Sequence, residues 1–143
     1  MATTVITRSE EETARVGRDL ARTLDVGSIV LLVGELGAGK TAFVRGLADG
    51  LGVAAGEVSS PTFTLIHEYR GGRLPLLHVD LYRVDGAREI DELGLEELGA
   101  AGVLAIEWAD KLARPMSNGV VVRIDQGAGD ERAITIADRA SSA

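Results

Sequence analysis

Short, continuous apolar runs in this chain alternate with stretches of helical period, and the change of pattern marks the expected elements. Residues 28–33 read Ser-Ile-Val-Leu-Leu-Val, and residues 103–106 read Val-Leu-Ala-Ile. Runs of this kind are typical of strands that are buried on both faces of a sheet. Residues 63–69 and 74–82 flank the sequence Arg-Gly-Gly-Arg at 70–73, which predicts a pair of strands joined by a hairpin turn.

An amphipathic helix is expected after Ser9. Residues 9–12 read Ser-Glu-Glu-Glu, which fits a capping box with acidic side chains in the first turn. Val16, Leu20 and Leu24 then recur at helical spacing. We expect this helix to cover one face of the sheet with its apolar side.

The two ends of the chain are expected to add further strands to the sheet. Residues 5–7 predict a short edge strand, and residues 119–125 and 131–137 predict a closing hairpin around a glycine-rich loop. These elements indicate the α/β class, with a mixed and mostly parallel sheet flanked by helices and a C-terminal β-hairpin. We expect one domain over residues 1–143, with frayed residues at 140–143.

A glycine-rich segment directly follows the first buried strand. Residues 34–41 read Gly-Glu-Leu-Gly-Ala-Gly-Lys-Thr and fit the phosphate-binding pattern G-x-x-x-x-G-K-[ST] in full. A helix is expected over 41–48, with its apolar side against the sheet. Strand, glycine-rich loop and helix in this order predict a P-loop NTPase fold that is organised around a bound nucleoside triphosphate.

The residue types in this segment suit that chemistry. Gly34, Gly37 and Gly39 let backbone N–H groups turn inward and approach a ligand closely, because glycine has no Cβ. Lys40 adds a positive charge for the β- and γ-phosphates, and Thr41 offers a hydroxyl group to Mg²⁺.

Two acidic residues follow apolar runs further along the chain. Asp80 comes after Leu-Leu-His-Val at 76–79, as a Walker B aspartate does, and Glu107 comes after 103–106. Hydrolysis needs carboxylates that help to hold Mg²⁺ and orient the attacking water. If both strands run parallel to 28–33, the two carboxylates converge at the edge of the sheet that holds the phosphates.

Three further residues lie close to these acids in the sequence. Thr62 belongs to a Ser-Pro-Thr loop that can reach the γ-phosphate or Mg²⁺ and change shape on hydrolysis. His67 and His78 lie within the predicted strands, and we interpret both as packed or hydrogen-bonded histidines rather than catalysts.

Composition narrows the functional classes. The chain has 143 residues, a net charge of −7 and no cysteine, which disfavours a broad nucleic-acid surface, disulfides and thiol catalysis. The acidic start of the chain does not resemble a signal peptide, and the longest apolar run is too short to span a membrane. We therefore expect a cytoplasmic protein.

The nucleotide is expected to be ATP. A GTPase should carry Asp-x-x-Gly after its Walker B strand, whereas Asp80 is followed by Leu-Tyr-Arg. Two alternatives remain open beside a regulatory ATPase. One is a nucleotide-dependent assembly module whose hydrolysis is incidental, and the other is a small-molecule kinase, for which the chain has little length to build a lid.

Five motifs together carry a resemblance to a known family. They are GELGAGKT, SSPTFTL, HVDLYR, DELGL and AIEW, in this order between residues 34 and 108. The chain resembles the TsaE (YjeE) family of bacterial tRNA threonylcarbamoyladenosine biosynthesis ATPases over nearly its whole length. The resemblance implies weak, partner-stimulated ATPase activity with ATP and Mg²⁺. It also implies action on a complex of TsaB and TsaD, contact with tRNA only through that complex, and a monomer in isolation.

The residues to which the motifs and the resemblance give a role fall into three groups. The nucleotide-binding group is Glu10, Gly34, Gly37, Ala38, Gly39, Lys40, Thr41, Ala42 and Arg132. The catalytic group is Lys40, Thr62, Asp80 and Glu107, and the Mg²⁺ group is Thr41 and Glu107.

Overall fold

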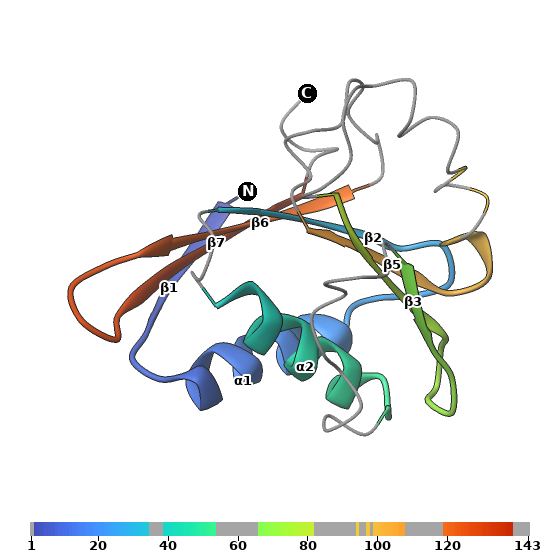
Figure 1. The fold of residues 1–143 in the computed structure, drawn as a ribbon, viewed down its shortest axis with the longest axis horizontal. Helices are drawn as coiled ribbons and strands as arrows, with labels where there is room; N and C mark the ends of the chain where they lie inside the picture. Colours follow the sequence, from blue (N-terminus) through green and yellow to red (C-terminus); the bar gives the residue numbers. More distant parts are fainter. Residues whose placement is uncertain are drawn as a thin grey trace.

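A mixed sheet runs through the molecule, with two helices on one of its faces (Figure 1). The computed structural model describes residues 2–34, 39–53, 66–81, 94, 97, 99–107 and 119–138. Their strands are β1 (Ala2–Thr7), β2 (Ile29–Gly34), β3 (Ile66–Tyr69), β4 (Leu76–Asp80), β5 (Val103–Glu107), β6 (Gly119–Gln126) and β7 (Arg132–Asp138). Their helices are α1 (Glu10–Ala21), α2 (Lys40–Gly50) and the short 3-10 helix η2 (Gly99–Ala101).

The strands of the described residues lie in the order β1-β7-β6-β2-β5-β4-β3. The four strands β6, β2, β5 and β4 pair in parallel, whereas the pairs β1–β7, β7–β6 and β4–β3 are antiparallel. The expected mixed sheet, edge strand and C-terminal hairpin are thereby confirmed. The expected hairpin between β3 and β4 is also present, but its connection runs over residues 70–75, two residues longer than predicted. The edge strand is longer than the sequence indicated, because it begins at Ala2 and pairs with β7 along its length.

The centre of the sheet is buried on both faces, as its continuous apolar runs predict. Val30 and Leu32 of β2 belong to the core cluster on the helix side, while Leu31 belongs to a second cluster on the opposite face. Every residue of β5 is buried. Parallel strands at the middle of a sheet lose both faces to packing, which explains why β2 and β5 show no alternation.

Helix α1 begins at the predicted cap. Ser9 has an extended backbone, and its Oγ accepts a hydrogen bond from the Glu12 N–H at 3.1 Å. Glu12 Oε1 accepts from the N–H of Arg8 at 3.0 Å, one residue before the position that a capping box uses. The cap fixes the point where the chain leaves β1 and enters the helix.

Helix α1 packs mainly against α2, so it covers the sheet less directly than expected. Glycines allow this close contact. A Cβ at Gly46 would lie 1.7 Å from the Ala14 carbonyl oxygen, and a Cβ at Gly17 would lie 2.3 Å from the Phe43 carbonyl oxygen. Helix α2 faces the sheet with Phe43, Val44 and Leu47, all fully buried. Of the helices described here, none is long and apolar enough to cross a membrane.

Gly46→Ala tests the contact between the helices. The added methyl group meets backbone, which cannot move aside as a side chain does, so we expect the free energy of unfolding to fall by about 1–3 kcal/mol. Arg15→Ala, at an exposed position of α1, is the control and should change it by less than about 0.5 kcal/mol. Urea unfolding measures both. Equal stability of the Gly46 variant and the wild type would contradict the close contact.

Candidate functional site

The parallel strands bring Asp80 and Glu107 together. Both β4 and β5 run parallel to β2 through the pairs β4–β5 and β5–β2, and Asp80 pairs directly with Glu107. Each acid is the last residue of its strand, so both lie at the carboxyl end of the sheet. The expected convergence of the two acids is confirmed. Asp80 is half-buried, whereas Glu107 is only 4% exposed.

The two acids also share a face of the sheet with α2. Side chains alternate along a strand, so Asp80 points to the same face as Leu76, and Glu107 to the same face as Ala105. Leu76 and Ala105 belong to the core cluster that contains Phe43 of α2. The carboxylates therefore project on the side of the sheet where the helix lies.

Glu107 has a buried partner for its carboxylate. His78 is fully buried, and its Nε2 lies 2.5 Å from Glu107 Oε2. A carboxylate can only accept, so His78 donates this hydrogen bond through Nε2–H. A carboxylate that is almost removed from water needs such a partner. The interpretation of His78 as a hydrogen-bonded histidine is confirmed.

The glycine-rich segment begins at the same edge of the sheet. Gly34 is the last residue of β2, with φ at 142°, and a Cβ there would lie 2.2 Å from the Ile124 carbonyl oxygen of β6. Glycine is thus required by both backbone conformation and space. Lys40 is 4% exposed, and its Nζ donates a hydrogen bond to the Gly34 carbonyl at 3.1 Å. This bond holds the ammonium group beside the carboxyl end of β2.

Helix α2 begins at this point with glycine as its N-cap. Gly39 adopts a left-handed conformation with φ at 100°, and no side-chain hydrogen bond caps the helix among the described residues. The first turn carries the positive end of the helix dipole and backbone N–H groups that suit an anion. Glycine at this position puts no side-chain oxygen in front of these N–H groups.

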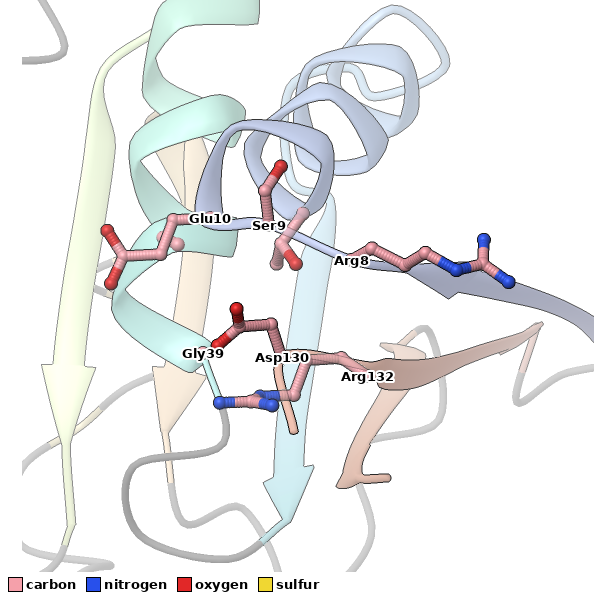
Figure 2. A pocket seen from close by; sticks show the side chains of 8 residues that line it. Arg8, Ser9, Glu10, Gly39, Asp130 and Arg132 are labelled. Carbon is pink, nitrogen blue, oxygen red and sulfur yellow. The ribbon is translucent and has the colours of Figure 1, made fainter. Parts of the chain in front are cut away.

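A pocket of about 370 Å³ opens beside this helix end. It is bounded by the start of α1, the start of α2 and the β6–β7 hairpin, and Gly39, Ala42, Glu10 and Arg132 are among its lining residues. In Figure 2 the guanidinium group of Arg132 extends toward Gly39, while the side chain of Arg8 extends away from Glu10. The structure therefore brings Glu10 and Arg132, far apart in sequence, to the glycine-rich segment.

Two hydrogen bonds hold Arg132 in the pocket wall. Its Nη1 donates to the carbonyl groups of Glu131 at 2.8 Å and Gly129 at 3.2 Å. A Cβ at Gly39 would lie 4.0 Å from Arg132 Nε, which shows how closely the hairpin approaches the start of α2. The pocket thus combines a positive group with the carboxylate of Glu10.

Four lining residues were not predicted as site residues from the sequence: Arg8, Ser9, Thr13 and Asp130. Thr13 is buried, and its hydroxyl group lies 2.8 Å from that of Thr7, which ties α1 to β1. Asp130 lies in the polar loop just before Arg132. This closeness to a predicted site residue is the sequence feature that could have indicated Asp130. Three predicted site residues, Gly37, Ala38 and Thr62, lie outside the described residues, so their roles stay predictions.

Comparisons with known proteins agree on one family. The family model for "Threonylcarbamoyl adenosine biosynthesis protein TsaE" matches residues 7–134. A relative from Treponema pallidum is 42% identical, and the match covers 92% of this chain and 98% of the relative. A relative from Streptomyces coelicolor is 43% identical over 80% of each chain. Both relatives are named tRNA threonylcarbamoyladenosine biosynthesis protein TsaE.

The fold has a solved counterpart as well. The crystal structure of YdiB from Bacillus subtilis superposes with a TM-score of 0.76 at 32% sequence identity. The superposition covers 99% of this chain and 88% of the YdiB chain. The mixed sheet with its helices is thus shared over the whole length of the chain.

The second histidine offers a test of the geometry around His78. His67 lies opposite His78 in the β3–β4 pair, and its Nδ1 lies 3.0 Å from the Tyr69 hydroxyl group. Burial lowers the pKa of His67 from 6.5, and the charge of His78 lowers this pKa further.

Because the pKa of His67 is lower in the folded than in the unfolded chain, the unfolded chain binds this proton more readily. We expect the stability of the wild type to fall as the pH drops below 6.5. His67→Gln should reduce this loss. An NMR titration of the wild type gives the pKa, and urea unfolding at several pH values gives the stability. A midpoint for His67 at or above 6.5 would contradict the account.

Proposed function

The chain belongs to the TsaE family of threonylcarbamoyladenosine biosynthesis proteins, and we propose that it is an Mg²⁺-dependent ATPase that supports this modification of tRNA. In this proposal residues 34–41 form a P-loop. ATP hydrolysis acts on a complex of TsaB and TsaD and sustains its cycles. The chain does not transfer the threonylcarbamoyl group itself.

One observation carries the ATPase proposal. The carboxylates of Asp80 and Glu107 and the ammonium group of Lys40 all lie at the carboxyl ends of neighbouring parallel strands. Ligands of open α/β sheets bind at this edge. Phosphoryl transfer depends on positive groups for the phosphates and on carboxylates for the metal ion and the water. The same edge supplies both kinds of group here.

The donor groups fit Mg²⁺. A carboxylate from Glu107 and a hydroxyl group from Thr41 are hard oxygen ligands, which this ion prefers over nitrogen or sulfur. When bound, Mg²⁺ neutralises the negative charge that develops on the phosphates. Glu107 would hold the ion, Lys40 would bind the phosphate oxygens, and Asp80 would orient the attacking water.

The pocket beside α2 suits the nucleoside end of ATP. The phosphates would lie against Gly39 and the first turn of α2, and the lining continues from there to Glu10 and Arg132. Carboxylates accept hydrogen bonds from ribose hydroxyl or purine amino groups, and a guanidinium group stacks on a planar base. Glu10 and Arg132 are therefore assigned to the ribose and base.

The charge of the chain fits action through other proteins. A net charge of −7 opposes binding to the phosphate backbone of tRNA, whose affinity depends on basic side chains. We therefore assign tRNA contact to the TsaB–TsaD complex. A cytoplasmic location and a monomeric state in isolation belong to the same proposal.

Lys40→Ala tests whether the site binds ATP. Loss of a charged hydrogen-bond donor to the phosphates should raise the Kd for ATP by about tenfold to a hundredfold. Arg15→Ala, at an exposed position of α1 outside the pocket, should bind ATP as the wild type does. Isothermal titration calorimetry with Mg²⁺ present measures both variants. Equal ATP affinity of wild type and Lys40→Ala would contradict the phosphate-binding role.

The product of ATP turnover separates the ATPase from the kinase alternative. A phosphorylated small molecule as product, in place of free phosphate, would indicate the kinase.

A further inference from the structure

The proposed function gives no role to His78, a buried polar side chain beside Glu107. His78 lies in β4 two residues before Asp80 and is fully buried, between the apolar residues Leu77 and Val79. Its Nε2–H donates to Glu107 Oε2 over 2.5 Å. The bond joins two neighbouring strands on the face of the sheet where the site lies.

The main chain of Glu107 is already fixed without this bond. Leu81 N–H donates to the Glu107 carbonyl at 3.2 Å, and Glu107 pairs with Asp80 on one side and Leu32 on the other. What the sheet does not fix is the rotation of the Glu107 side chain about its own bonds. The bond from His78 sets that rotation. It engages Oε2, and within the described part of the chain no hydrogen bond engages Oε1.

A histidine at position 78 lowers the stability of the fold, which argues against a purely structural role. Its Nδ1 is buried, and no hydrogen-bond partner for this atom lies among the described residues. An unpaired buried polar atom destabilises a fold, whereas leucine or valine would pack here without that cost. Leu76 of β4 and Ala105 of β5, which pairs with His78, are buried and apolar on the same face of the sheet. The imidazole ring therefore has a task that an apolar side chain cannot perform.

We propose that His78 is a positioning residue, which fixes the orientation of the Glu107 carboxylate that would hold the Mg²⁺ of bound MgATP. The inference rests on the proposed function, since it takes Glu107 as a ligand of that ion. Ligating carboxylates in metal sites are held by hydrogen bonds from neighbouring groups, and loss of such a bond lowers metal affinity or activity about tenfold to a hundredfold.

Two substitutions at His78 separate positioning from packing. His78→Gln can place an amide nitrogen close to the position of Nε2, so it keeps a donor for Glu107. His78→Asn is equally polar but shorter, and its amide nitrogen corresponds to Nδ1. The matched control is His67→Asn, because His67 lies across from His78 in the neighbouring strand and contacts Tyr69. Thermal unfolding without nucleotide shows whether each variant is folded.

Two measurements on the full chain provide the readout. The first is the Kd of a fluorescent ATP analogue, once in excess Mg²⁺ and once in excess EDTA. The second is the Mg²⁺ concentration that gives half-maximal phosphate release from ATP. For His78→Asn we expect the EDTA Kd to stay within about twofold, while the half-maximal Mg²⁺ concentration rises about tenfold to a hundredfold. His78→Gln should recover most of this loss, and His67→Asn should behave as the wild type.

The outcomes distinguish this inference from the proposed function. Equal effects of His78→Gln and His78→Asn, or an equal loss of affinity in Mg²⁺ and in EDTA, would show a structural residue and overturn the inference alone. Wild-type protein that binds the analogue no better in Mg²⁺ than in EDTA would overturn the proposed metal role, and the inference with it. Glu107→Gln serves as the reference for loss of the carboxylate.

Discussion

The site depends on the parallel, in-register pairing of β2, β5 and β4. This pairing sets Asp80 directly beside Glu107, and Glu107 beside Leu32, two residues before Gly34. A shift of one residue in either pair would turn a carboxylate to the opposite face of the sheet, away from α2. The buried apolar residues on both faces oppose such a shift, because it would exchange side chains between the two packed core clusters.

Close packing of the two helices is the second constraint. Gly17 and Gly46 let the backbones of α1 and α2 approach to distances that a Cβ would prevent. This contact places the start of α1 beside the start of α2, so that Glu10 and Gly39 line one pocket. The close packing of α1 against α2 thus determines the shape of the proposed nucleoside pocket, although neither Gly17 nor Gly46 lines this pocket.

The sequence predicted the strands of the sheet well because continuous apolar runs are local signals. The convergence of Asp80 and Glu107 at one edge also followed, from the rule that parallel strands end at the same edge. The bond from His78 to Glu107 could not be predicted, since it depends on the register between two strands far apart in the chain. The helix contact was missed for a similar reason. Glycines within α1 and α2 form no apolar pattern in the sequence. That they allow the close helix contact is seen only from the approach of the two backbones.

The central claim is that this chain is an ATPase whose hydrolysis serves a tRNA-modifying complex, and phosphate release tests it most directly. Release from ATP and Mg²⁺ would be measured for the chain alone, for the chain with TsaB and TsaD, and for that mixture with tRNA. We predict slow release by the chain alone and a clear rise with the partners, and no such rise for Lys40→Ala. Unchanged release with the partners, while modification of the tRNA proceeds, would contradict the account.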